Sequence, residues 1–232
     1  MNAPWSPEIG IGFYTVPQVA SLLHLQALNI RRWLGGYTFY GRDGESHEMP
    51  PLWTPQLPAW DTHIELGFRD LIELRFVKAF LDAGLGLLTI RHCLEHARTY
   101  VDDERPFSTR RFQTDGKTIF LESAARAGDE EVLNLKNGQY VIRQVIDRTF
   151  KDLDIEDDTV RRWWPMRGRR TVVIDPARSF GQPIVARYGV PTLVLSQAVE
   201  SEGSTAAAAR AFEVPERAVR EAVAFERSLA GS

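Results

Sequence analysis

Apolar residues recur at helical spacing in two short runs near the start of the chain. Thr15 and Gln18 stand three residues apart, the spacing of a capping box, and therefore predict the start of a helix. The apolar positions that follow have the i, i+3, i+4, i+7 spacing of one helix face: Val16, Val19, Ala20 and Leu23. A turn at His24 and Leu25, and a second helix ending at residues 35–36, both glycine, complete a predicted helix-turn-helix.

The second of these helices has an apolar face and a polar face. Its inward positions are apolar: Ala27, Ile30, Trp33 and Leu34. Its outward positions hold Asn29, Arg31 and Arg32, whose donor patterns suit base edges and phosphates in a major groove. No acidic residue occurs between Glu8 and Asp43, where an even scatter would place roughly four or five. We therefore predict a DNA-binding helix pair, against the alternative of a capped helical hairpin in an ordinary core.

Residues 37–60 mix aromatic residues with glycine and proline, which indicates either a proline-stiffened loop or a two-stranded wing. The tip of such a wing is Arg42-Asp43-Gly44, and Arg42 would reach phosphates or a minor groove. Six side chains are therefore candidate DNA contacts: Thr15, Gln26, Asn29, Arg31, Arg32 and Arg42.

Residues 67–83 return to helical periodicity with a wide apolar surface, so this helix needs neighbours on two sides. Gly84 and Gly86 end it, and Thr89 is predicted to cap another helix of about ten residues. The later helix contains His92 and His96, whose spacing would allow a shared metal ion. The zinc-protease order is absent and no third ligand is evident, so we expect a solvated face and no metal site.

The central segment, residues 105–170, has a β-type pattern. Residues 110–121 are predicted to form a hairpin with a turn at Asp115-Gly116, and Asn137-Gly138 precedes a second β-like segment. A polar loop over residues 124–131 would connect the two.

Arginines are dense between residues 161 and 170, around Trp163 and Trp164, which we expect to be core anchors. The cluster is either a patch for phosphates or for an acidic partner site, or a hinge whose arginines balance the acids at residues 152–158. Both interpretations are consistent with the residues.

The C-terminal segment, residues 171–232, begins with a β-like run and then shows three helical stretches. Ser204 is predicted to cap the second stretch, and Pro215 to open the third, after a turn at Glu213-Val214. The last two stretches therefore have a helix-turn-helix shape. From residue 200 onward there are six glutamates against four arginines, so this part is expected to bind protein rather than DNA.

Composition bounds the protein class. The chain has 232 residues, 44% hydrophobic, with a formal net charge of −3, so any DNA contact must be local. Its single cysteine, Cys93, excludes an internal disulfide, and no signal peptide or membrane-spanning run is evident, so we expect a cytoplasmic protein. Neither a glycine-rich phosphate loop nor a nucleophile with a plausible base occurs, so neither an enzyme nor a cofactor is expected.

These features predict a mainly α (α+β) fold in three parts. Residues 1–104 would form a winged helix-turn-helix domain, residues 105–170 a region of small β-hairpins, and residues 171–232 a three-helix module.

Several residues match the MerR-type helix-turn-helix pattern. They are Tyr14, Thr15, Ala20, Leu25, Ile30, Arg31 and Gly36, with Asp70, Leu74, Phe76 and Gly84 in the following helix. His24 and Gln26 depart from it, since they replace the usual turn glycine and capping serine. Histidine tolerates a left-handed backbone better than most residues, so the turn can survive.

The C-terminal stretches DPARSFGQPIV, VPTLVL and EGSTAAAARAFEVPERAVREAVAFE resemble a small helical domain of uncharacterised function in VapB-type antitoxins. The order of modules resembles the longer branch of that family over nearly all of the chain. The resemblance implies a dimeric antitoxin that represses its own operon and masks a toxin, a PIN-domain ribonuclease.

A PIN-type site is a cluster of acids around a divalent metal, which an inserted arginine would neutralise. Arg167, Arg169 and Arg170 are therefore candidate toxin contacts. The alternative function is a MerR-type regulator that responds to a ligand, which a large apolar pocket in the second half would favour.

Overall fold

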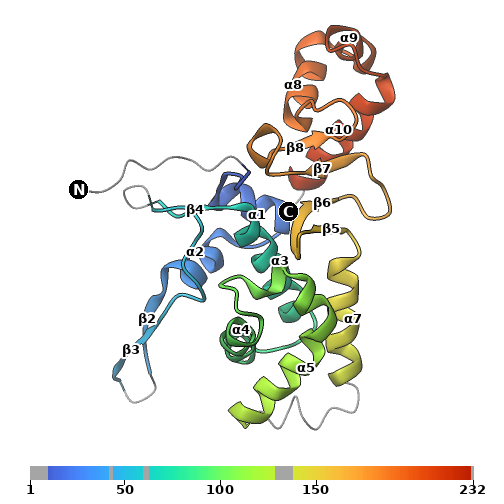
Figure 1. The fold of residues 1–232 in the computed structure, drawn as a ribbon. Coiled ribbons are helices and arrows are strands. Elements are labelled where there is room, and N and C mark those ends of the chain that lie inside the picture. The colour runs from blue at the N-terminus through green and yellow to red at the C-terminus, as the bar shows by residue number, and fades with distance from the viewer. Residues whose placement is uncertain (1–9, 42–43, 60–62, 129–137, 231–232) are drawn as a thin grey trace, which may run out of the picture.

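The computed structural model describes residues 10–41, 44–59, 63–128 and 138–230. The fold is mixed, with helices accompanied by small antiparallel sheets (Figure 1). The helices in chain order are α1 (Val16–Leu23), α2 (Ala27–Gly35), α3 (Phe68–Asp82), α4 (Leu87–Val101), α5 (Arg110–Ala127), α7 (Gly138–Phe150), α8 (Thr192–Glu202), α9 (Thr205–Ala211) and α10 (Glu216–Ala230). Two 3₁₀ turns, η1 (Pro106–Ser108) and η2 (Ser179–Gly181), complete the helical elements of the described residues.

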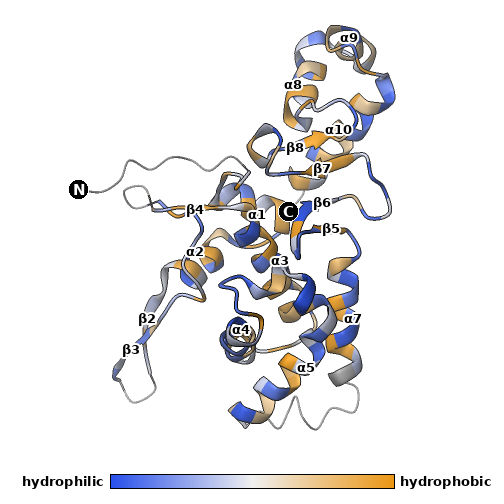
Figure 2. Cartoon of the chain, in the orientation of Figure 1, coloured by the Kyte–Doolittle hydropathy of each residue, from blue (hydrophilic) through white to orange (hydrophobic). Residues whose placement is uncertain are grey.

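The strands form three antiparallel sheets in the described part of the chain. The first pairs β1 (Tyr14–Thr15) with β4 (Glu65–Leu66), and the second pairs β2 (Tyr37–Tyr40) with β3 (Ser46–Met49). The third has the order β5-β6-β7-β8, from Leu153–Glu156, Thr159–Trp163, Val172–Ile174 and Pro183–Val185. The β2–β3 hairpin extends away from the helices (Figure 1) and is mostly pale or blue in Figure 2, as a strand pair with few hydrophobic residues would be.

The main core is built around α3, which contacts α1, α4, α7 and η1. At its centre the ring of Phe76 has four aromatic neighbours whose centroids all lie within 6.4 Å: Phe80, Phe107, Phe112 and Phe150. These rings come from α3, η1, α5 and α7, so burial of the aromatic residues holds four elements together. The wide apolar surface predicted for residues 67–83 is thus covered by neighbours on more than one side.

The predicted hairpin at residues 110–121 is wrong, because these residues belong to α5. Thr109 caps this helix, since its Oγ1 accepts the backbone N–H of Phe112 at 3.1 Å. Gly116 is buried, and a Cβ atom there would lie 3.0 Å from Ile146 Cδ1 of α7. The glycine that suggested a turn therefore allows close packing of two helices.

Two other local predictions are also corrected. The second β-like segment is helix α7, which begins at Gly138, while the preceding Asn137 lies outside the described residues. The predicted loop over residues 124–131 starts inside α5. Thr89 lies within α4, which has 15 residues and Gly86 at its N-cap.

The three helical stretches predicted for the C-terminal segment are helices α8, α9 and α10, and α10 begins directly after Pro215. Ser204 is the N-cap of α9, with its Oγ accepting the Ala207 N–H at 3.1 Å. A second, smaller hydrophobic cluster joins these helices to β8: Val185, Leu195, Ala198, Ala208, Ala209, Val214, Ala218, Val219 and Ala222. Phe225 of α10 belongs instead to the main core, so α10 connects the two clusters.

Candidate nucleic-acid interface

Helix α1 begins at the predicted capping box. The Thr15 N–H donates to Gln18 Oε1 at 2.8 Å, and the Gln18 N–H donates to Thr15 Oγ1 at 3.5 Å. His24 ends the helix in the left-handed conformation with φ 51°, and the Leu25 N–H donates to the Ala20 carbonyl at 2.9 Å. The turn between α1 and α2 is therefore closed without the glycine usual in the MerR pattern.

Helix α2 buries one face and exposes the other. Ile30, Trp33 and Leu34 are buried, whereas Arg31 and Arg32 are exposed. Asn29 is half-buried, so it is less accessible than predicted. Gln26 is the N-cap of α2 and exposed, and its side chain forms no capping hydrogen bond. The polar side chains of α2 thus remain largely available to a partner.

The β2–β3 hairpin follows α2 directly and carries exposed aromatic side chains. The Arg32 guanidinium lies 5.5 Å from the centroid of the Tyr37 ring, which joins α2 to the hairpin. Phe39 stacks on His47 across the strands with centroids 5.4 Å apart, and Tyr40 is 79% exposed. Arg42 lies outside the described residues.

Arginines of α4 hold the segment that leaves the hairpin. Arg91 donates to the carbonyls of Pro50 and Pro51 at 2.8 and 3.1 Å, and Arg98 donates to the Leu52 carbonyl at 2.5 Å. Neither arginine was predicted from the sequence as a functional residue. Their i, i+7 spacing, which places them on one helix face, is the signal that could have identified them.

Asp70 of α3 is fully buried and completes this attachment. Its carboxylate accepts Trp53 Nε1 at 3.0 Å, the Gln56 N–H at 2.8 Å, the Gly67 N–H at 2.9 Å and Arg105 Nε at 2.7 Å. The cation and the three N–H groups offset the cost of burying the charge. Trp53, Gln56 and Gly67 are therefore fixed relative to α3.

The arginine cluster is divided between strand β6, which contains Arg161 and Arg162, and the loop between β6 and β7. Arg167, Arg169 and Arg170 are all exposed. Arg170 forms an ion pair with Asp154, at 3.1 Å from Oδ1, and its guanidinium lies 5.0 Å from the Trp164 ring centroid. Figure 1 shows this loop on the side of the molecule opposite the β2–β3 hairpin. The candidate DNA contacts and the candidate toxin contacts therefore do not form one site.

The two tryptophans of this segment differ in burial. Trp163 is buried, as predicted, and the guanidinium of Arg75 lies 5.1 Å from its ring centroid. Burial lowers the pKa of Arg75 to about 10, against the opposing effect of Asp152. Trp164 is half-buried and donates from Nε1 to Asp154 at 2.9 Å.

His92 and His96 were predicted to form a solvated helix face. His96 instead contacts α5. Its Nε2 lies 3.1 Å from Glu122 Oε2, and its Nδ1 lies 3.1 Å from an Arg126 guanidinium nitrogen. No group of three or more possible metal ligands is found among the described residues. Within those same ranges, no helix has the length and apolar character needed to cross a membrane.

Comparisons with known proteins place this geometry in context. No protein-family model matches the chain. A protein of Mycobacterium tuberculosis named "Putative antitoxin VapB45" is 24% identical over 190 residues, which cover 78% of this chain and 79% of the relative. The crystal structure of Rv2018 from Mycobacterium tuberculosis shares the fold, with a TM-score of 0.67 and 19% identity over 90% of this chain and 96% of that one. The resemblance of this chain to a VapB-type antitoxin is thereby confirmed over most of both sequences.

Proposed function

We propose that this protein is a DNA-binding antitoxin of a type II toxin-antitoxin system, which represses its own operon and neutralises a PIN-domain ribonuclease. The observation that carries the DNA-binding part is the exposure of Arg31 and Arg32 on a helix whose opposite face is buried. The antitoxin part rests on the sequence relationship to the VapB-type protein.

In this proposal α1, α2 and the β2–β3 hairpin act as a winged helix-turn-helix. Arg31, Arg32 and Asn29 would enter the major groove, where guanidinium and amide groups bind base edges and phosphates. Thr15 and Gln26, which precede α1 and α2, would contact phosphates together with Arg42 of the wing. One short helix buries little surface, so a two-fold dimer on paired half-sites is expected.

The exposed β6–β7 loop supplies the proposed toxin contacts. Arg167 and Arg169 form no ion pair within the part of the chain that the structure describes, whereas Arg170 is paired with Asp154. A metal site lined by acids attracts such unneutralised guanidinium groups. Because this loop lies away from α2 in Figure 1, bound DNA would leave it accessible to the toxin.

Coexpression with the product of the adjacent small open reading frame tests the toxin part. The two proteins are expected to copurify, and the purified complex should cleave RNA more slowly than the toxin alone. The double variant Arg167→Ala/Arg169→Ala should weaken the complex by about tenfold or more, since each lost charged contact is worth about 1.5–3 kcal/mol.

The matched control is Arg143→Ala/Arg217→Ala, which removes two positive charges from exposed, i, i+4 paired positions of α7 and α10. Absence of any complex would overturn toxin binding. If Arg167→Ala/Arg169→Ala bound the toxin with unchanged affinity, these arginines would not be part of the interface.

A further inference from the structure

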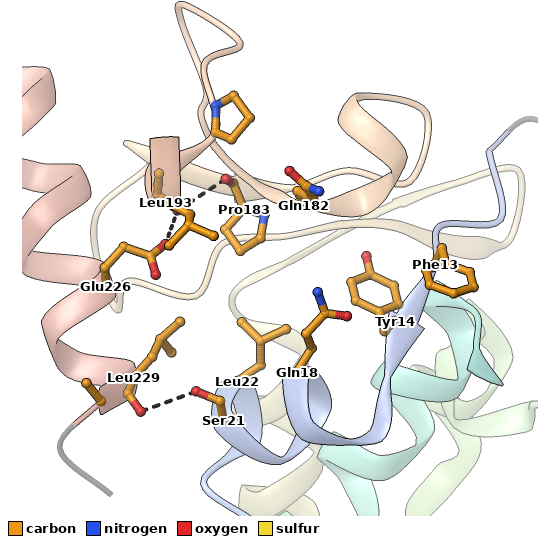
Figure 3. A pocket seen from close by; sticks show the side chains of 13 residues that line it. Phe13, Tyr14, Gln18, Ser21, Leu22, Gln182, Pro183, Leu193, Glu226 and Leu229 are labelled. Atoms are coloured by element: carbon orange, nitrogen blue, oxygen red, sulfur yellow. Dashed lines mark hydrogen bonds between the residues drawn. The ribbon is translucent and has the colours of Figure 1, made fainter. Parts of the chain in front are cut away.

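A cavity of about 320 Å³ lies between α1 and the C-terminal elements β8, α8 and α10 (Figure 3). Its volume falls within the range of small-molecule sites, about 300–1,000 Å³. Most of the residues that line it are apolar, among them Phe13, Leu193 and Leu229, and its polar lining includes Gln18 and Glu226. This cavity is distinct from the α2 surface and from the β6–β7 loop.

Hydrogen bonds fix its walls. The Tyr14 hydroxyl donates to the Gly181 carbonyl at 2.8 Å, and Ser21 Oγ donates to the Leu229 carbonyl at 3.2 Å. Burial, followed by the charge of Asp175, raises the pKa of Tyr14, so its hydroxyl remains a neutral donor. The cavity is therefore formed before any ligand arrives.

Glu226 supplies the negative charge of the cavity lining. The other two glutamates of α10 are paired within the helix, Glu216 with Arg220 at 2.7 Å and Glu221 with Arg217 at 3.1 Å. Glu226 has no ion pair with any residue that the structure describes. An unpaired carboxylate beside apolar side chains lacks the cation that would best compensate it.

The hydrogen bond that Glu226 does receive leaves acceptor capacity. Its Oε1 accepts from the hydroxyl of Thr192, and the same hydroxyl lies 3.2 Å from the Pro183 carbonyl. A hydroxyl carries one hydrogen, while a carboxylate offers about four acceptor positions. Figure 3 shows Glu226 on the α10 side of the cavity, across from Gln18 of α1.

Apolar side chains at the cavity are left partly uncovered. Leu193 is 54% exposed and Phe13 is 42% exposed, although both line the cavity. Covering this surface would be favourable, at about 25 cal/mol for each Å² of apolar area. The cavity thus combines an apolar wall with a carboxylate that lacks a cation.

We propose that this cavity binds a small organic cation, a primary ammonium group carried on an apolar body. The Glu226 carboxylate accepts hydrogen bonds from the ammonium group, and Leu193, Phe13 and Leu229 cover the hydrocarbon part. The inference depends on neither DNA nor toxin binding, since no residue assigned to those contacts lines the cavity.

Calorimetric titration of the full chain with three phenethyl-sized probes tests the site. Phenethylammonium should bind at least about tenfold more tightly than 2-phenylethanol, because a charge-assisted hydrogen bond is worth about 1.5–3 kcal/mol. Phenylacetate, which carries the opposite charge, should not bind.

Glu226→Gln should reduce the phenethylammonium affinity to that of the alcohol. The control Glu200→Gln removes the same charge from an exposed position of α8 outside the cavity and should change nothing. Leu193→Arg, at a residue too exposed for folding to depend on it, places a competing cation at the cavity and should abolish binding. The proposal would be overturned if the wild type bound phenethylammonium and 2-phenylethanol with equal affinity, or if no probe bound. It would also be overturned if Glu226→Gln or Leu193→Arg still bound phenethylammonium more tightly than 2-phenylethanol.

Discussion

Two buried acids of α3 show how single residues position the elements of this protein. Asp70 is compensated by the Arg105 guanidinium, whose Nε lies 2.7 Å from its carboxylate. Glu73, also fully buried, accepts the N–H groups of Ser108 and Phe107 at 2.8 and 3.2 Å. Burial raises the pKa of Glu73 to about 7, against the opposing effects of Arg69 and of these hydrogen bonds. Its charge state therefore changes near neutral pH.

The free energy of unfolding should decrease as the pH rises from about 4.5 to about 7, because Glu73 loses its proton in this range. The raised pKa means that the folded chain binds this proton more tightly than the unfolded chain, so the cost is absent below pH 4.5 and complete above pH 7. The shift corresponds to a cost on the order of 3 kcal/mol. Urea unfolding of the wild type and Glu73→Gln at pH 5 and pH 8 measures it.

Relative to the wild type, Glu73→Gln should be more stable at pH 8 than it is at pH 5. Glu200→Gln, at an exposed position, serves as the control and should show no such change. A difference that is the same at both pH values would show that Glu73 does not titrate in this range.

At the level of elements, the sequence predicts those whose signals are local. The capping box at Thr15 and Gln18 and the cap at Ser204 fix α1 and α9, because a cap requires only residues a few positions apart. The hairpin predicted at Asp115-Gly116 was wrong because it also relied on a local signal, a dipeptide that is common in hairpin turns. What decides the structure there is contact between Gly116 and Ile146, 30 positions away in another helix, and no local pattern reports it.

Gly116→Val should destabilise the protein by about 1–3 kcal/mol, the usual cost of overpacking a core. A Cβ atom added there would lie 3.0 Å from Ile146 Cδ1 and 3.1 Å from the Phe112 ring, so the two methyl groups of valine have no space. Thr118→Val, an isosteric change at an exposed position of the same helix, provides the control. Thermal unfolding measures both. A Gly116 variant as stable as the control would contradict the close packing of α5 on α7.

The candidate site was predictable only in part. Exposure of Arg31 and Arg32 follows from helical periodicity, because their positions oppose the apolar face of α2. The attachment of the hairpin by Arg91, Arg98 and Asp70 depends on residues about 15 to 50 positions away from the segments they hold. Such contacts require the three-dimensional fold.

On the scale of the whole molecule, the chain separates its proposed activities in space. The α2 surface and hairpin lie on one side in Figure 1, and the β6–β7 loop lies on the other. Phe225 of α10 packs into the main core, and the Tyr14 hydroxyl donates a hydrogen bond to the Gly181 carbonyl, 167 positions away in the sequence. The division into residues 1–104, 105–170 and 171–232 stays a prediction. Both β7, through Val172 and Ile174, and α10, through Phe225, place residues of the C-terminal part in the main core.

The central claim is that Arg31 and Arg32 contact duplex DNA, and fluorescence anisotropy with the duplex upstream of the gene tests it most directly. Titrations over a range of salt concentrations should show that Arg31→Ala and Arg32→Ala each weaken binding about tenfold. The salt slope should decrease by about one for each lost phosphate contact. The control Arg143→Ala, which removes an exposed arginine of α7, should bind the duplex with the affinity of the wild type. Wild-type affinity and salt slope in both α2 variants would contradict the account.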